Sequence, residues 1–168
     1  MTRLSKGLLV AALHALIVAG IGAKFLYDRS HYPRVWAETA PYDPDMPIRG
    51  RYVNIALLVI ADRPPAALKG PGSSDNFRAR LEARGGRLVA IPDDEAGRHW
   101  IVAARCGDRD CWRLAEPLAY FIPEHADDPS RAPEGASLWA EVTVPPKGAP
   151  RPVRLGNARE GKVEPIEP

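Results

Sequence analysis

Residues 7–23 read GLLVAALHALIVAGIGA and carry no formal charge. Lys24 follows, but a lysine at a helix end can extend its ammonium group to the lipid headgroups, and the next three residues, FLY, continue the apolar character. A helix over residues 7–27 is roughly 30 Å long at about 1.5 Å per residue, which matches the hydrocarbon core of a bilayer. The sequence therefore predicts a transmembrane helix over residues 7–27, after a short tail over residues 1–6.

A cleaved signal peptide is the alternative for the same residues. Its apolar region is about 7–15 residues long and ends in small residues at the cleavage site, which Gly20 and Gly22 would supply. The apolar run is longer than that, and Tyr27, Tyr32 and Trp36 follow it as interfacial aromatic residues do. We therefore expect the helix to be retained as an anchor in the lipid bilayer.

Small residues recur along one side of the predicted helix. Ala11, Ala15, Ala19 and Ala23 lie four residues apart, so they form a nearly straight stripe along which another helix can approach closely. His14 lies beside this stripe, and an ionisable residue inside a membrane usually faces a partner or a polar cavity. The alternative is that alanine is simply abundant here and that His14 is neutral near one leaflet. We expect these five residues to pack against another helix in the membrane.

The two cysteines, Cys106 and Cys111, lie in the sequence RCGDRDCW. The intervening GDRD favours a tight turn between two strands, which would bring the thiols together. In an oxidising compartment a disulfide across so short a loop contributes about 2 kcal/mol. Two free thiols are the alternative, and a zinc site would need a second ligand pair that the sequence lacks. We predict a disulfide and no metal.

Composition predicts a folded domain after the helix. The chain has 45% hydrophobic and 26% charged residues and a net charge of +2, with acidic and basic residues interspersed. This pattern excludes a nucleic-acid-binding protein, which would carry a basic patch in a recognisable motif. Eighteen prolines break the chain into short elements.

The pattern of apolar residues predicts a mainly β domain of the α+β class over residues 50–157. An extended connector over residues 28–49 precedes it, and a flexible tail over residues 158–168 follows it. Residues 75–84 are expected to form its one short helix, because Ser74 can cap it and Phe77 and Leu81 share a helical face. The expected strands are 51–61, 87–91, 99–106, 111–114, 118–122, 137–144, 151–155 and 162–163. Short strands separated by turns indicate a compact antiparallel sheet or barrel.

The segment YDPDMPIRGRYVNIAL, residues 42–57, resembles the signature of the GDYXXLXY family. Asp43 and Pro44 match its Asp-Pro lead-in, and Gly50 and Tyr52 match the glycine and first tyrosine of the motif. Three positions differ: Arg51 replaces the aspartate, Ile55 the leucine, and Leu57 the last tyrosine. Two later segments, YFIPEH at residues 120–125 and SLWAEVTV at residues 137–144 followed by PVRL, are similar to other elements of the family.

This resemblance implies a bacterial protein anchored in the inner membrane by one helix, with its domain on the periplasmic side and with multi-spanning membrane proteins as partners. The family has no assigned enzyme activity or cofactor. The positive-inside rule gives no orientation, because Arg3 and Lys6 with the α-amino group balance Lys24, Arg29 and Arg34. The cysteines favour the periplasm as well.

Hydrolytic chemistry needs an activated nucleophile, but Asp45 stands before Met46 where a signal-peptidase-like fold would have its serine. KGPGSSD also lacks the features of a phosphate-binding loop, so no catalytic set is evident. The sequence therefore predicts a non-enzymatic accessory domain without a cofactor. The alternative is a periplasmic ligand- or cation-binding domain that uses the charged loops at residues 43–51 and 124–128. The first loop carries Asp43, Asp45, Arg49 and Arg51, and the second carries Glu124, His125, Asp127 and Asp128.

Overall fold

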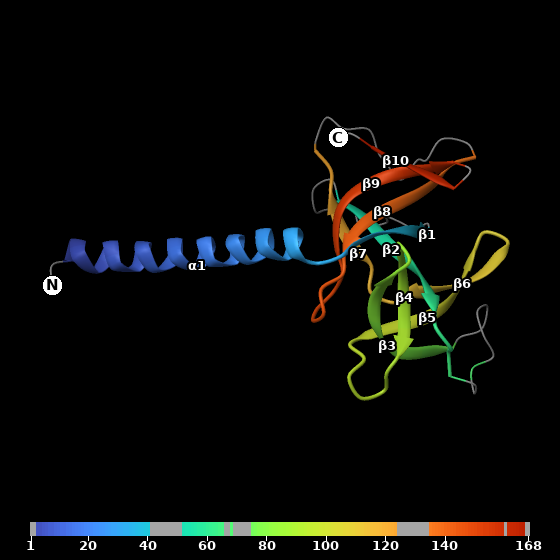
Figure 1. Cartoon of the computed structure of the whole chain (residues 1–168). Helices are drawn as coiled ribbons and strands as arrows, with labels where there is room; N and C mark the ends of the chain where they lie inside the picture. Colours follow the sequence, from blue (N-terminus) through green and yellow to red (C-terminus); the bar gives the residue numbers. More distant parts are fainter. Residues whose placement is uncertain are drawn as a thin grey trace. The chain divides into compact units, whose positions relative to one another are not determined.

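The computed structural model describes residues 3–40, 52–65, 68, 75–123, 135–159 and 161–166. The chain divides into two compact units, residues 1–32 and residues 33–168. The first unit is a single apolar helix and the second is a β domain (Figure 1). One N-terminal helix followed by a β domain is the architecture that the sequence predicts.

Helix α1 (Arg3–His31) is longer than the predicted span at both ends. The most apolar window of its Ser5–His31 segment has a mean hydropathy of 2.0 and is fully exposed, so by length and composition this helix can cross a membrane. The last turn is stabilised by an ion pair between Lys24 Nζ and Asp28 Oδ2 at 3.1 Å and by stacking of Tyr27 on His31. These i,i+4 pairs stabilise the helical conformation of the residues that follow Tyr27.

Ten strands form the described part of the β domain. They are β1 (Arg34–Ala40), β2 (Tyr52–Ala61), β3 (Asn76–Arg84), β4 (Arg87–Pro92), β5 (His99–Cys106), β6 (Arg109–Leu114), β7 (Leu118–Phe121), β8 (Ser137–Thr143), β9 (Arg151–Arg159) and β10 (Lys162–Pro165).

Strand β2 joins the two halves of this domain (Figure 1). Its first residues pair with β7, from Tyr52↔Phe121 to Ile55↔Leu118, and its middle pairs with β1 at Thr39↔Leu57. Its last residues pair with β6 on one side and, in parallel, with β4 on the other. On one face of this shared strand Val53, Ile55, Leu57 and Val59 are buried, whereas on the other face Ala56 is buried and Ile60 is exposed.

The domain has two parts, a closed ring of five strands in the lower half of Figure 1 and an open antiparallel sheet in the upper half. The ring runs β2–β4–β3–β5–β6 and closes when β6 pairs with β2 again. Closure leaves no free edge in the ring, and its core is apolar, with Leu88, Ile101 and Leu114 almost fully buried. The open sheet runs β1–β8–β9–β10.

The predicted helix over residues 75–84 is wrong, because these residues form β3. Phe77, Ala79 and Leu81 are buried and alternate with exposed residues, which is the period of a strand. Phe77 and Leu81 are four residues apart, a spacing that fits either a helix face or a strand face. Gly85 and Gly86, with φ of +54° and +74°, form a two-residue hairpin turn to β4 rather than a helix end.

Two predicted boundaries also differ from the structure. Residues 34–40, expected in the connector, form β1 and pair with β8 from Arg34↔Thr143 to Glu38↔Trp139. The segment expected as a flexible tail contains β10, which includes the expected strand at residues 162–163 and pairs with β9 from Lys162↔Arg159 onward. Strand β1 takes its hydrogen bonds from β8, which lies far along the chain, so local composition does not reveal it. The other predicted strands are confirmed, with ends shifted by a few residues.

Candidate binding groove between strands β1 and β2

Strands β1 and β2 pair only briefly and then separate. Their pairing is limited to Thr39↔Leu57 and Ala40↔Ala56, because the rest of β1 turns to β8 and the rest of β2 turns to β4 and β6. The space between them is a groove of about 380 Å³. We call it the β1–β2 groove; its walls include Trp36 and Glu38 of β1, Leu58 and Ile60 of β2, Arg109 and Cys111 of β6, and Trp139 of β8.

Two tryptophans give the groove an apolar wall. Trp36 and Trp139 are partly buried and lie on the same face of the open sheet, because Trp139 is paired with Glu38, two residues after Trp36. The indole Nε1–H of Trp139 donates to Ser137 Oγ at 2.9 Å, which satisfies its one polar atom. Across the groove the side chain of Ile60 is 46% exposed. Partly exposed indoles facing an exposed aliphatic side chain are typical of protein-binding surfaces.

The indole of Trp36 is held from two directions. The guanidinium of Arg154 lies 5.5 Å from the ring centroid and is itself paired with Glu141 through Nε and Oε2 at 2.6 Å. Behind the ring lies Gly156, where an added Cβ would come within 3.0 Å of Trp36 Cη2 and 2.8 Å of the Glu164 carbonyl oxygen. The indole of Trp36 therefore lies between the guanidinium of Arg154 and the backbone of Gly156.

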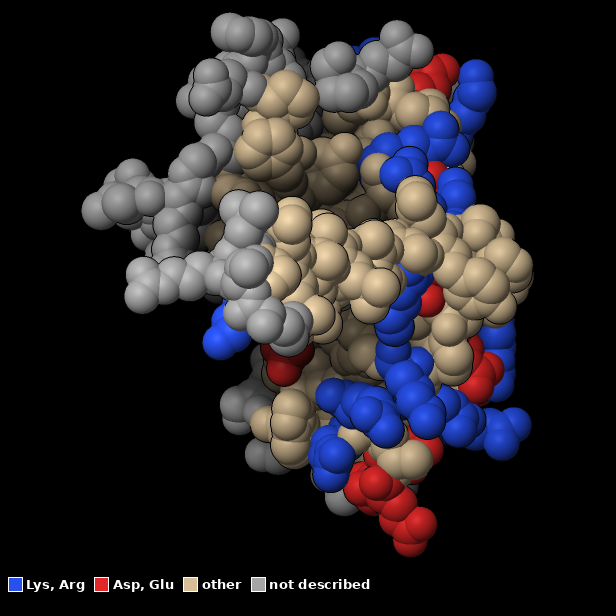
Figure 2. All heavy atoms as spheres, turned by 90° about the vertical axis from the view of Figure 1, so that its left-hand side faces the viewer, with Lys and Arg blue, Asp and Glu red and all other residues tan. Residues whose placement is uncertain are grey.

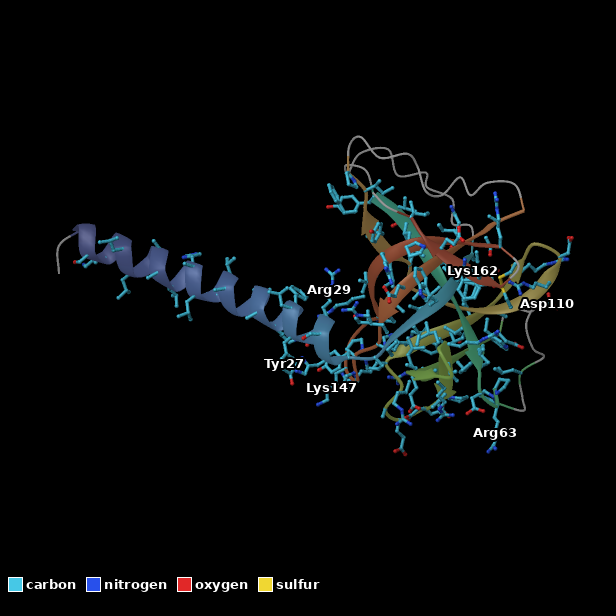
Figure 3. All side chains as sticks on the ribbon, turned by 45° about the horizontal axis from the view of Figure 1, so that its top comes forward. Tyr27, Arg29, Arg63, Asp110, Lys147 and Lys162 are labelled. Atoms are coloured by element: carbon cyan, nitrogen blue, oxygen red, sulfur yellow. A yellow bond between two sulfur atoms is a disulfide. The ribbon has the colours of Figure 1, made fainter. Side chains whose placement is uncertain are left out.

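A charged rim crosses one end of the groove. Arg109 begins β6 and forms an ion pair with Glu38 of β1. The hairpin that carries Arg109 is closed by the disulfide between Cys106 and Cys111, whose Cα atoms lie 6.0 Å apart. The predicted disulfide is thus confirmed. It fixes the turn from which Arg109 reaches β1, and Asp110 beside it is exposed (Figure 3).

The groove has the features of a binding site for a protein segment. Its walls are aromatic and aliphatic, and charged side chains stand at its margin, which matches the core and rim of protein interfaces. Within the described ranges no group of three or more His, Cys, Asp or Glu residues could hold a metal ion. Both cysteines are bonded to each other.

The sequence-predicted residues of the helix lie apart from this groove in the chain. Ala11, Ala15, Ala19 and Ala23 are exposed along α1. The ring of His14 is exposed too, and its Nδ1–H donates to the carbonyl oxygen of Val10 at 2.8 Å. This bond within the helix lowers the cost of placing the imidazole in an apolar environment.

The motif residues are described only in part. Tyr52, Ile55 and Leu57 lie on β2, whereas Asp43, Pro44, Gly50 and Arg51 lie outside the described residues. Ile55 and Leu57 are almost fully buried, and the exposed ring of Tyr52 contacts Phe121 edge to face at 5.5 Å. The segments quoted for the resemblance are neighbours: residues 52–55 pair with 118–121, and 137–143 pair with 151–158.

The alternative site at residues 43–51 and 124–128 also lies outside the described residues, and it stays a prediction. The groove residues Glu38, Ile60, Arg109 and Trp139 were not predicted as a site. The only local signal was the alternation of side chains along each strand, which does not show which strands lie together.

Comparison of the chain with family models, with curated proteins and with solved structures found no match.

Proposed function

We propose that this chain is a non-enzymatic accessory protein that binds a multi-spanning membrane protein. Helix α1 anchors it in a bacterial inner membrane as a single span. The β domain lies on the periplasmic side and holds a segment of the partner in the β1–β2 groove. The resemblance to the GDYXXLXY family is part of this proposal, since that family combines the same anchor with such partners.

The observation that carries the proposal is the groove itself. It offers two indoles and the side chain of Ile60 to a ligand, and its shape is fixed by the Arg109–Glu38 ion pair and by Arg154 and Gly156 behind Trp36. A preformed site loses little conformational entropy on binding. Tryptophan residues at such positions contribute much of the affinity in protein complexes.

Two further observations support the membrane setting and the compartment. The most apolar window of α1 has a mean hydropathy of 2.0, and the exposed small-residue stripe of this helix allows close packing of another helix. The Cys106–Cys111 disulfide supports an oxidising compartment, which in bacteria is the periplasm.

The test is purification of the full-length protein in mild detergent, with the co-purifying proteins identified by mass spectrometry. The groove variant is Ile60→Glu and its matched control is Trp100→Glu, because these side chains are 46% and 48% exposed and both lie on strands of the β domain. A third variant, His14→Leu with Ala15→Leu and Ala19→Leu, alters the helix surface alone. We expect a multi-spanning membrane protein to co-purify with the native chain and with the Trp100→Glu control, but not with the Ile60→Glu variant. The absence of any specific partner of the native chain would refute the proposal.

The same experiment distinguishes the contribution of α1 to partner binding from that of the groove. Loss of the partner with the helix variant but not with Ile60→Glu would move the interface from the groove to α1. Equal loss with Trp100→Glu would show that an added charge anywhere on the domain disrupts binding, and would contradict a role for the groove.

A further inference from the structure

A second hollow in the β domain is lined by cations. It measures about 430 Å³, and four cationic side chains but only one carboxylate line it. We call it the basic cleft and define it by Arg78, Arg80, Arg98 and Lys147, with Glu95 and His99 beside them. In the lower part of the face drawn in Figure 2, Lys and Arg side chains lie next to Asp and Glu side chains.

Most of this positive charge is not neutralised within the described part of the chain. Arg80 pairs with Glu82 at 3.2 Å and approaches Asp93 at 3.7 Å. No carboxylate of the described residues pairs with Arg78, Arg98 or Lys147. Three exposed cations around one hollow attract an anion more strongly than any of them does alone.

The walls of the cleft are fixed by backbone contacts. The loop after β4 lies against β3, where Asp93 N–H donates to the Arg78 carbonyl oxygen at 3.0 Å and Gly97 N–H donates to the Asp93 carbonyl oxygen at 2.9 Å. A Cβ at Gly97 would lie 2.1 Å from that oxygen and 2.9 Å from the Ala79 nitrogen, so this close approach requires glycine. Arg78 and Arg98 are thereby held on neighbouring segments.

The other wall belongs to the β8–β9 connection, which begins where the chain enters the domain. Val144 N–H, just after β8, donates to the carbonyl oxygen of Pro33 at 3.0 Å. Only Tyr32 separates Pro33 from the end of α1, and only two prolines separate Val144 from Lys147. Few residues and one backbone hydrogen bond therefore link Lys147 to the end of α1. Asp110, at the β1–β2 groove, lies at the opposite end of the β domain from Lys147 (Figure 3).

We propose that the basic cleft binds the headgroups of anionic phospholipids in the membrane that α1 spans. This inference rests on the proposed function, because it requires α1 to be a retained anchor. Phosphate groups accept hydrogen bonds from guanidinium and ammonium groups, and basic side chains next to a membrane helix are attracted to acidic lipids. Binding at the cleft leaves the β1–β2 groove free for the partner protein.

The test places the full-length chain in nanodiscs of phosphatidylcholine, with or without phosphatidylglycerol, and follows amide hydrogen exchange. We expect phosphatidylglycerol to slow exchange in residues 93–99 and 144–149 and to leave residues 58–61 of the groove unchanged. The triple variant Arg78→Gln, Arg98→Gln and Lys147→Gln should lose this protection. A matched variant, Arg105→Gln, Arg159→Gln and Lys162→Gln, removes three exposed cations from outside the cleft and should retain it.

Several outcomes would overturn the proposal. Equal exchange in the two kinds of disc, or loss of protection in the matched variant, would refute the cleft as the lipid site. Protection by inorganic phosphate in phosphatidylcholine discs would make the ligand a free anion instead of a lipid. A chain that does not enter discs at all would refute the anchor, and with it the proposed function, whereas a chain that enters without lipid-dependent protection refutes the cleft alone.

Discussion

Arg109, the first residue of β6, forms an ion pair with Glu38 of β1, 71 residues earlier in the chain. This contact joins the five-strand ring to the open sheet across the end of the β1–β2 groove. The Cys106–Cys111 disulfide is not part of this ion pair, and it affects the pair only by setting the shape of the hairpin that carries Arg109. The hairpin at the rim of the groove is thus held by the ion pair between Arg109 and Glu38 and by the disulfide between Cys106 and Cys111.

The ion pair should define the groove more than it stabilises the fold. The side chains of Arg109 and Glu38 are 62% and 25% exposed, and pairs in such solvated positions contribute about 0.2–1 kcal/mol. A double-mutant cycle with Arg109→Ala and Glu38→Ala, measured by chemical denaturation, should give a coupling free energy in that range. A coupling several times larger would show that the pair is a main support of the fold.

Loss of the disulfide should lower the free energy of unfolding by about 2 kcal/mol, because it closes a short loop in the unfolded chain. The variant with Cys106→Ala and Cys111→Ala and the reduced native protein should show the same decrease in guanidinium unfolding followed by tryptophan fluorescence. Addition of reductant to the double variant is the control and should change nothing. Equal stability of oxidised and reduced native protein would contradict the expectation.

Gly97→Ala should destabilise the β domain and open the basic cleft. The added methyl carbon would lie 2.1 Å from the Asp93 carbonyl oxygen, so the loop must move away from β3. We expect a cost of about 1–3 kcal/mol in the free energy of unfolding, as for other overpacked sites. Asp94→Ala, an exposed neighbour in the same loop, is the control, and an equal effect of both changes would count against the close approach as the cause.

The free energy of unfolding of the β domain should fall as the pH decreases below about 6.5, the usual pKa of histidine. Burial lowers the pKa of His99, and this effect exceeds the opposing effects of its hydrogen bond to the Gly148 backbone and of Glu116, while Arg98 lowers the pKa further. In the unfolded chain the histidine is protonated below a pH of about 6.5, whereas folded His99 stays neutral to a lower pH. The free energy of unfolding therefore rises with pH between the folded and the unfolded pKa, and it reaches its full value above about pH 6.5.

Denaturation of the native protein and of His99→Gln at several pH values checks this expectation. The native protein should lose stability between neutral and mildly acidic pH, and His99→Gln should lose less over the same interval. Parallel pH profiles for the two proteins would show that His99 does not carry the effect.

The parts of the fold that follow from local sequence were predictable. The uncharged run before Lys24 predicted α1, the continuous apolar run predicted β2, and the turn residues between the cysteines predicted their hairpin. Residues 75–84 were misassigned because Phe77 and Leu81 satisfy a helix and a strand equally well, and only the neighbours β4 and β5 decide between them.

The groove could not be predicted in the same way. It exists because β1 and β2 share two residue pairs and then diverge, and because Arg109 reaches Glu38 from another hairpin. These relations are set by pairing between distant strands. Trp36 and Glu38 were expected in an extended connector, and nothing local placed Ile60 or Trp139 beside them.

Photocrosslinking in cells tests the central claim, that the groove binds a membrane protein, most directly. A photoreactive residue would replace Ile60 in the full-length chain, and in a second protein it would replace Trp100, which is equally exposed but lies outside the groove. We predict that position 60 forms an adduct with a multi-spanning membrane protein and that position 100 does not. No adduct at position 60, or the same adduct from both positions, would contradict the account.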